Sequence, residues 1–219
     1  MYKMTVTGRK TAGGNHMNAQ DCLQILRDIK DVSFATVDEK GMPHNRIIDV
    51  MIVEENRLVF CTGRGKDFYR QLTANPHVAI SGMNKNWQMV RLTGKVRKLE
   101  DQKQWIDRIF EENPSMNDVY PGDARYILDP FAIESGNLEF FDLSTSPIHR
   151  ESFSFGDSKP VEKGFFITEE CIGCGTCQAN CPQQCIDEGT PFVIRQDSCL
   201  HCGLCFENCP VEAIVRRGA

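Results

Sequence analysis

The sequence predicts a mainly β protein with helices, of the α+β class, built from two units of unequal size. Three observations indicate this. Short apolar runs separated by turn-forming strings fill much of residues 18–144, as in antiparallel strands joined by hairpins. Residues 145–163 are rich in Ser, Pro, Gly and charge and predict a linker. Nine of the eleven cysteines then fall within residues 171–209.

Composition and charge exclude some classes of function. A chain of 219 residues with 41% hydrophobic residues can build two modest domains with cores of their own. The net charge of −5, without a stripe of Lys and Arg, argues against a nucleic-acid binder. No run approaches the roughly 18 apolar residues of a membrane span, and the first residues lack the apolar segment of a secretory signal. We therefore expect a soluble, cytoplasmic protein without a membrane partner.

The first unit follows an N-terminal extension over residues 1–17 and spans residues 18–144. Apolar residues at helical spacing predict a helix over residues 19–30, with further helices at 66–76 and 100–113. Alternating patterns and turn strings predict strands over residues 32–37, 43–53, 58–62, 77–82, 87–99, 126–133 and 137–143. This order of elements is typical of a β-barrel.

The second unit spans residues 164–219 and is defined by a repeat. The pattern C-x₂-C-x₂-C-x₃-C-P occurs in "CIGCGTCQANCP" and again 28 residues later in "CLHCGLCFENCP". Disulfides are poorly compatible with a reducing cytoplasm. Zinc ribbons use two cysteines per knuckle, whereas each run here has three closely spaced cysteines followed by a fourth. The strings "GFFITEE" (164–170) and "TPFVIRQD" (190–197) are expected to form a strand pair. Seven acidic and three basic residues make residues 165–219 the acidic part of the chain.

The doubled cysteine run resembles that of bacterial two-cluster ferredoxins, in which the fourth cysteine of each run serves the other cluster. The resemblance implies two 4Fe–4S clusters with crossed ligand sets. One cluster would bind Cys171, Cys174, Cys177 and Cys209, and the other Cys199, Cys202, Cys205 and Cys181. Cys185 stands where the second half has Ala213, so we interpret it as a small buried hydrophobe rather than a ninth ligand.

The string "CTGRGKD" combines groups that suit a phosphate. Thr62, Arg64 and Lys66 place a hydroxyl and two cations on a flexible turn at the start of a predicted helix, where the helix dipole also favours an anion. On the string alone, a solvated Gly-rich hairpin end is an equally good interpretation. The string is no Walker loop, because it lacks the required spacing and the Ser or Thr after the lysine.

Residues 18–144 resemble the pyridoxamine 5′-phosphate oxidase-like family of FMN-binding split barrels. The resemblance is carried by "HNRIIDVMIVEENRLVFCTGRGKDFYRQLTANPHVAIS" and "WQMVRLTGKVRKLE". It implies a split β-barrel followed by the ferredoxin-like 2[4Fe–4S] domain, with FMN as cofactor and a homodimer whose FMN sites lie at the subunit boundary. The cofactor-binding positions that it implies are Arg46, Ile47, Ile48, Asp49, Thr62, Arg64, Lys66 and Gln88.

Departures from the family limit the functional prediction. Members that act on pyridoxamine phosphate have a basic residue near position 51, where this chain has Met51, and the ferredoxin-like unit replaces their carboxyl-terminal segment. We therefore expect no vitamin B6 oxidation. The expected function is a flavin-dependent oxidoreductase that exchanges electrons among an external electron-transfer protein or reductant, two 4Fe–4S clusters, FMN and a small molecule. An electron carrier without a substrate and a redox sensor are the alternatives, and no catalytic residue is assigned.

Overall fold

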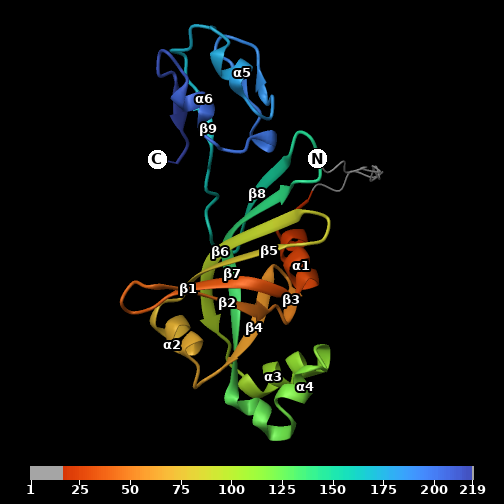
Figure 1. The fold of residues 1–219 in the computed structure, drawn as a ribbon. Coiled ribbons are helices and arrows are strands. Elements are labelled where there is room, and N and C mark those ends of the chain that lie inside the picture. Colours follow the sequence, from red (N-terminus) through yellow and green to blue (C-terminus); the bar gives the residue numbers. More distant parts are fainter. Residues whose placement is uncertain (1–16, 219) are drawn as a thin grey trace, which may run out of the picture.

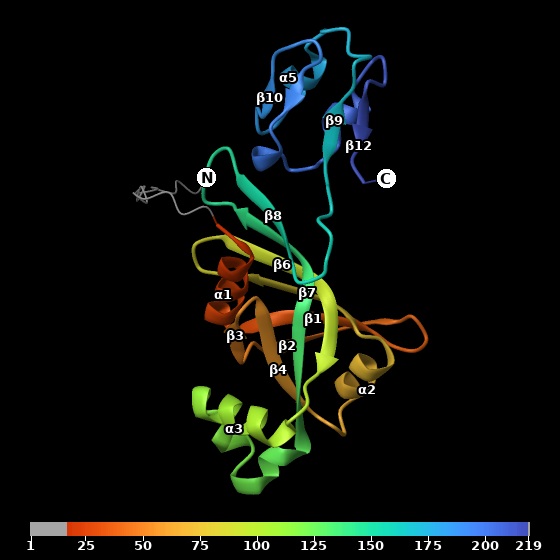
Figure 2. The same ribbon diagram turned by 180° about the vertical axis from the view of Figure 1, so that it is seen from behind.

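The computed structural model describes residues 17–218 and shows a curled sheet with helices, followed by a small module with its own core (Figures 1 and 2). Except for Met17, the N-terminal extension predicted over residues 1–17 lies outside the described residues. The helices are α1 (Ala19–Ile29), α2 (Asp67–Ala74), α3 (Gln102–Glu112), α4 (Met116–Val119), α5 (Thr176–Asn180) and α6 (Leu204–Glu207), with 3₁₀ turns at Gly122–Ile127 and Gln196–Ser198.

The large sheet contains eight strands, all paired in antiparallel fashion. They are β1 (Asp31–Val37), β2 (Pro43–Asp49), β3 (Ile52–Glu54), β4 (Arg57–Gly63), β5 (His77–Met83), β6 (Gln88–Lys98), β7 (Leu128–Asp142) and β8 (His149–Phe155). The order across the sheet is β2-β1-β5-β6-β7-β4-β3, and β8 pairs with the second half of β7. This curled sheet confirms the predicted split barrel.

Two apolar clusters form the core of the barrel. One cluster contains four packed aromatic rings, those of Phe34, Phe60, Phe68 and Phe131. The centroids of rings in contact are 4.9 to 5.9 Å apart. The second cluster lies between β3, β4 and α3 and includes Met51. Helix α1 begins with a capping box formed by Asn18 and Asp21 and buries the apolar stripe that the sequence predicted. None of the helices within residues 17–218 is long and apolar enough to cross a membrane.

The structure corrects the prediction of two strands at residues 126–133 and 137–143, because β7 runs through both. The intervening Ser135 and Gly136 suggested a turn. Instead, Gly136 lies against Gly94 of β6, where a Cβ atom on either glycine would come within 2.6 Å of a carbonyl oxygen of the other strand. The glycines therefore permit a close approach of β6 and β7 beside a register shift between Gly94 and Val96.

The predicted linker over residues 145–163 also needs correction, because it contains β8. The strand was missed because its pattern is not apolar: Arg150 occupies a buried position, with 7% of its surface exposed. The guanidinium group donates a hydrogen bond to the Glu139 carboxylate on β7 at 2.7 Å. Because its charge is paired, Arg150 can occupy a buried strand position at which an alternating pattern would show an apolar residue.

The small module has the predicted strands but pairs them differently. β9 (Phe165–Ile167) pairs with β12 (Ile214–Arg216), and β10 (Ile186–Asp187) pairs with β11 (Val193–Ile194). The expected pair of residues 164–170 with 190–197 is therefore wrong. Because β9 precedes the first cysteine run and β12 follows the second, the two halves of the repeat are interlocked rather than adjacent.

Candidate functional site

The module brings the cysteines of the two runs together in crossed sets around two pockets. The distal thiol pocket is lined by Cys171, Cys174, Cys177 and Cys209 among other residues. The proximal thiol pocket is lined by Cys181, Cys199, Cys202 and Cys205, together with Cys185. Each pocket therefore takes three cysteines from one run and the fourth from the other. All eleven cysteines of the chain are free thiols.

The loops around the pockets have the backbone shape that a buried anion needs. Gly175 and Gly203, which are 28 residues apart, both have left-handed backbones with φ of 75° and 85°. Backbone N–H groups point at sulfur: the amide of His201 donates to Cys199 Sγ at 3.4 Å, and the amide of Ala213 to Cys209 Sγ at 3.3 Å. Such N–H groups stabilise negative charge on sulfur.

The thiol pockets suit a polynuclear cluster. Burial raises the pKa of Cys205 to about 11, so its thiolate forms only when a cation neutralises it. Among the described residues, no three His, Cys, Asp or Glu side chains are grouped closely enough to hold a single metal ion. In a 4Fe–4S cluster each thiolate binds its own iron, so the four ligands surround a volume rather than converge on one point.

Cys185 is buried, with 1% of its surface exposed, as the sequence predicted. Its sulfur nevertheless lies 3.6 Å from Cys181 Sγ, beside the thiol that closes the proximal pocket. Burial, together with Cys181, raises the pKa of Cys185. Cys185 therefore contacts the proposed ligand set without being distinguished from it by its pKa, and the repeat alone did not reveal this contact.

In the barrel, the predicted phosphate loop joins β4 to the N-terminus of α2. Thr62 ends in a buried hydroxyl oxygen that has no hydrogen-bond partner in the described part of the chain. Lys66 is the N-cap of α2 and is exposed, and within residues 17–218 no side chain caps the first turn of the helix. An unpartnered buried hydroxyl, an exposed ammonium group and open helix N–H groups together fit a phosphate.

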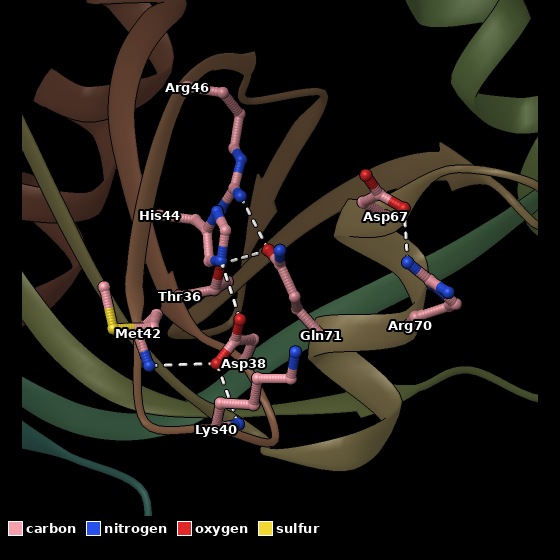
Figure 3. A network of polar contacts seen from close by, with 9 residues as sticks. All are labelled: Thr36, Asp38, Lys40, Met42, His44, Arg46, Asp67, Arg70 and Gln71. Atoms are coloured by element: carbon pink, nitrogen blue, oxygen red, sulfur yellow. Dashed lines mark hydrogen bonds and ion pairs between the residues drawn. The ribbon is translucent and has the colours of Figure 1, made fainter.

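Arg46 of β2 is a half-buried cation with neutral partners (Figure 3). Its guanidinium group donates to Gln71 Oε1 at 2.6 Å and to Thr36 Oγ1 at 2.5 Å, and it lies 4.6 Å above the ring of Phe68. Within residues 17–218 no carboxylate forms an ion pair with Arg46 or Lys66. Two cations without carboxylates against the same helix are available to an anion.

Arg64, in contrast, already has an acidic partner. Its guanidinium group lies 3.0 Å from the carboxylate of Asp129, which also contacts Lys98 at 2.6 Å and accepts a hydrogen bond from Tyr69 at 2.9 Å. Burial acts to raise the pKa of Asp129, but the bonds from Lys98, Tyr69 and Arg64 outweigh it and hold the pKa below its usual value. Sequence reasoning missed Lys98 and Tyr69, because they join the loop only through the fold.

The remaining positions on β2 alternate between the two faces of the sheet. Ile48 packs against the apolar cluster of the four aromatic rings, on the same side of the sheet as Arg46. Ile47 is 63% exposed on the opposite face. Burial, and then the neighbouring carboxylate of Asp31, raises the pKa of Asp49. The four consecutive residues that the resemblance implied therefore do not share one face.

Gln88 lies far from the phosphate loop of its own chain. Thr62 pairs with Asp129 near the start of β7, whereas Gln88 pairs with Asp142 at the other end of that strand. The side chain of Gln88 donates to the Asp142 carboxylate at 3.0 Å and accepts from Asn84. The structure therefore does not bring this predicted residue to the other cofactor positions within one chain.

The module rests on the Gln88 end of the barrel. The amide of Ile148 donates to Gln183 Oε1 at 3.0 Å, and Arg150 donates to the carbonyl oxygen of Cys199 at 3.5 Å. Both acceptors belong to residues that line the proximal thiol pocket. The proximal pocket is therefore the one that faces the barrel.

An ion cluster secures this contact. The carboxylate of Glu139 accepts from Arg150 and lies 3.1 Å from Lys163. Burial acts to raise the pKa of Glu139, but Lys163 and Arg150 outweigh it and lower the pKa. Burial, followed by the charge of Arg150, lowers the pKa of the adjacent His201 to about 4, so this imidazole is neutral at pH 7.

Comparisons with known proteins agree with this division. Residues 19–119 match the family described as Pyridoxamine 5′-phosphate oxidase, and residues 170–213 match the family described as 4Fe–4S dicluster domain. The chain is 37% identical over 65 residues to a pyridoxine/pyridoxamine 5′-phosphate oxidase of Serratia proteamaculans, and the aligned residues cover 30% of each chain. It is 32% identical over 99 residues to that of Salmonella paratyphi B, which covers 43% of each. The chain thus spans less than half the length of these curated relatives.

A solved structure shows the same fold for the barrel. A NimC/NimA family protein from Clostridium acetobutylicum superposes with a TM-score of 0.54 and 24% sequence identity, and the match covers 63% of this chain and 92% of that one. At this identity the likeness concerns the fold alone. The chain therefore carries a pyridoxamine 5′-phosphate oxidase-type split barrel and a 4Fe–4S dicluster domain, and this combination indicates a role in redox chemistry or electron transfer.

Proposed function

We propose that this chain, in which a pyridoxamine 5′-phosphate oxidase-type domain is joined to a 4Fe–4S dicluster domain, is a flavin-dependent oxidoreductase. It exchanges electrons among an external carrier, two 4Fe–4S clusters, FMN and a small molecule. One observation carries the proposal: a thiol pocket lined by cysteines of both runs contacts a barrel whose β4–α2 turn carries a buried hydroxyl group without a hydrogen-bond partner in the described residues. Iron–sulfur clusters transfer electrons singly, and FMN when bound accepts either one or two.

Each cluster would be held by one of the two thiol pockets. The distal pocket supplies Cys171, Cys174, Cys177 and Cys209, and the proximal pocket supplies Cys181, Cys199, Cys202 and Cys205. Backbone amides aimed at Cys199 and Cys209 support this assignment, since they stabilise the charge of a bound cluster. Cys185 stays outside both sets.

The FMN phosphate would lie between Arg46 and the first turn of α2. Arg46 and Lys66 supply positive charge, and Thr62 supplies the hydroxyl group that lacks a partner. Arg64 contributes less, because Asp129 already offsets its charge. These residues bind and orient the cofactor and perform no covalent chemistry.

The relatives' vitamin B6 oxidation is not part of the proposal. Met51 stands near the position of a basic residue in the enzymes that bind pyridoxamine phosphate, and it is buried in the second core cluster with 5% of its surface exposed. An apolar side chain in the core offers no charge to a substrate phosphate. The substrate therefore belongs to another class of small molecule that accepts or donates electrons at the flavin.

The external electron-transfer protein would contact the module at the distal pocket. Cys174 is exposed there, Ile172 is 64% exposed, and Glu169, Glu170 and Glu212 are exposed close by in the sequence. An apolar centre with acidic neighbours suits a partner with basic residues around its own cofactor. The free thiols also fit a cytoplasmic location.

Anaerobic purification followed by analysis of iron, sulfide and flavin tests the proposal. We expect about eight irons and eight sulfides per chain, as two such clusters imply, together with FMN. A low-potential protein donor should reduce first the clusters and then the flavin. Stoichiometric zinc without visible absorption would contradict the cluster assignment, and flavin that is never reduced through the clusters would contradict the proposed electron transfer.

A further inference from the structure

The two thiol pockets resemble each other in the groups that surround their sulfurs. In the distal pocket the hydroxyl group of Thr176 lies 3.4 Å from Cys174 Sγ. In the proximal pocket the thiol of Cys185 lies 3.6 Å from Cys181 Sγ. Each pocket also has an exposed cysteine, Cys174 in the distal one and Cys202 in the proximal one. Hydrogen bonds to sulfur and solvent exposure both influence the reduction potential of a cluster, but both occur in both pockets.

The residues beside the ligands differ in charge between the two halves of the repeat. Glu170 precedes the first cysteine of the first run, where the second run has Ser198. Glu212 follows the last cysteine of the second run by three residues, where the first run has Gln184, and both amides donate to the carbonyl oxygen of that cysteine, at 3.2 and 3.1 Å. Because the ligand sets are crossed, both carboxylates flank the distal pocket and both neutral residues flank the proximal pocket. Within residues 17–218 neither glutamate forms an ion pair.

Cations gather at the proximal pocket instead. Arg150 is buried, and its guanidinium group donates to the carbonyl oxygen of Cys199, a cysteine of the proximal pocket, at 3.5 Å. The carboxylate of Glu139 accepts from Arg150 and also lies 3.1 Å from Lys163 and 3.9 Å from Arg91. Three cations thus surround one carboxylate, and three positive charges with one negative charge leave a net charge of +2 at the contact with the barrel.

From this contrast we propose that the module is a directed relay, in which the proximal cluster has the higher reduction potential and draws electrons toward the barrel. The inference rests on the proposed function and adds the direction of electron transfer to it. A reduced cluster carries one more negative charge than an oxidised one, so nearby cations stabilise the reduced form and nearby carboxylates destabilise it. The buried charge of Arg150 acts more strongly than an exposed one, because solvent and salt screen it less.

The relay moves one electron at a time. An external low-potential one-electron donor reduces the distal cluster, which is oxidised again as the proximal cluster is reduced. No bond forms or breaks in this step, and no proton is needed. Full reduction of one FMN takes two such electrons from the proximal cluster and two protons from solvent.

A potentiometric titration of the full chain at constant pH, followed by low-temperature electron paramagnetic resonance, tests the proposal. Cys174→Ser should keep only the proximal cluster and Cys202→Ser only the distal one, so that each potential is measured alone. We expect the proximal site to hold the electron about tenfold more strongly or better, which corresponds to about 59 mV. A higher potential at the distal site would overturn the proposal, whereas a parental protein without clusters would overturn the proposed function instead.

Removal of opposite charges at the same contact separates an electrostatic role from a structural one. Arg150→Met removes a positive charge and should lower the proximal potential, whereas Glu139→Gln removes a negative charge and should raise it. Each change should alter the preference of the electron for the proximal site by about two- to tenfold, as one charge roughly 10 Å away would, at parental iron content. Shifts in the same direction in both variants would show that the contact only holds the pocket in shape, and would contradict the proposal.

Substitutions at the equivalent exposed positions keep the test independent of the single-cluster variants, because all eight proposed ligands stay in place. Glu212→Gln should raise the distal potential, and Gln184→Glu should lower the proximal one. The double variant should therefore bring the two reduction steps of the intact module closer together than either single variant does. The matched control is Asp123→Asn, which removes an exposed carboxylate of the barrel and should leave both steps unchanged. A separation of the steps that none of the module variants alters would refute the assignment of the potentials to these charges.

Discussion

Replacement of Arg46 by methionine tests whether this arginine binds the cofactor or only stabilises the fold. The guanidinium group makes two short hydrogen bonds to neutral acceptors, and a bond from a charged donor is worth about 1.5–3 kcal/mol to folding before the cost of half-burying the cation is subtracted. The Thr36 hydroxyl would keep its bond to Gln71 Oε1 at 2.6 Å, and the methionine side chain can still pack on Phe68. Removal of a half-buried, unpaired cation offsets part of the loss. We therefore expect the free energy of unfolding to fall by about 3 kcal/mol or less.

The affinity of the folded protein for FMN should fall as well, for a separate reason. A charge-assisted hydrogen bond to the phosphate is worth about 1.5–3 kcal/mol, which corresponds to a weakening of about ten- to hundredfold in Kd. Lys66→Ala should have a similar effect, whereas Arg64→Ala should have a smaller one because Asp129 already offsets the charge of Arg64. Titration of flavin-free protein with FMN, followed by flavin fluorescence, measures these changes.

The matched control is Arg97→Met, since Arg97 is an exposed arginine that makes two hydrogen bonds to Glu134. Its FMN affinity should equal that of the parent, and the iron content of every variant should stay constant. If Arg46→Met binds FMN as tightly as the parent, the phosphate lies elsewhere. If the variant loses unfolding free energy while the folded protein binds FMN as tightly as the parent, Arg46 is a structural residue and the argument from its neutral partners is refuted.

Four further predictions concern other parts of the molecule. Cys181→Ser should remove the proximal cluster and leave about four irons, whereas Cys185→Ala should leave about eight; iron analysis and low-temperature electron paramagnetic resonance decide between them. Arg150→Met should lower the unfolding free energy by less than about 3 kcal/mol, because Lys163 remains beside the buried carboxylate, and should slow flavin reduction at constant iron content. Asp129→Asn should destabilise the protein at pH 7, as measured by urea unfolding. The parental protein should sediment at about twice the chain mass, because the resemblance implies a homodimer.

The pH dependence of the Asp129 variant follows from the sign of the shift. The folded pKa of this carboxyl is depressed, so its stabilisation is fully present above its unfolded pKa of about 3.9 and is lost as the pH falls through the folded value. The deficit of Asp129→Asn should therefore shrink toward pH 3. The exposed Asp123→Asn serves as control, and a deficit that does not change with pH would show that the ion cluster has no such role.

Results that would contradict the other predictions are equally specific. Loss of the distal cluster in Cys181→Ser would exclude the crossed ligand sets, and loss of four irons in Cys185→Ala would make that residue a ligand. Unchanged flavin reduction in Arg150→Met would exclude the barrel contact from the electron path. A parental protein that sediments as a monomer with tightly bound FMN would exclude the dimer.

The sequence was most informative where the chemistry is local. Cysteine spacing groups three cysteines of each run in one short loop. The resemblance to ferredoxins added the fourth cysteine of the other run, and this cysteine lines the same pocket as the three. The string around Thr62 and Lys66 is equally local, and its prediction of a phosphate site stays a prediction. Periodicity also predicted most barrel strands, since their outward and inward positions alternate regularly.

What the sequence could not predict depends on distant partners. Arg150 appeared to be a linker residue because its partner, Glu139, is on another strand. The neutral surroundings of Arg46 depend on Gln71 and Thr36, which come from a helix and a neighbouring strand. The pairing of β9 with β12 likewise joins the two ends of the module. In each case the missing information is a contact between residues far apart in the chain.

The position of Gln88 shows what a resemblance leaves open about a site. The resemblance implies that Gln88 contacts the same cofactor as Thr62, yet their β7 partners, Asp142 and Asp129, are thirteen residues apart. Within one chain, Gln88 and Thr62 therefore do not line the same site. The module contacts the barrel through Ile148 and Arg150, so Gln88 lies at the module end of the barrel and the phosphate loop lies at the other end. Resemblance alone names residues by their place in the sequence, and only the pairing of the strands shows which of them can act together.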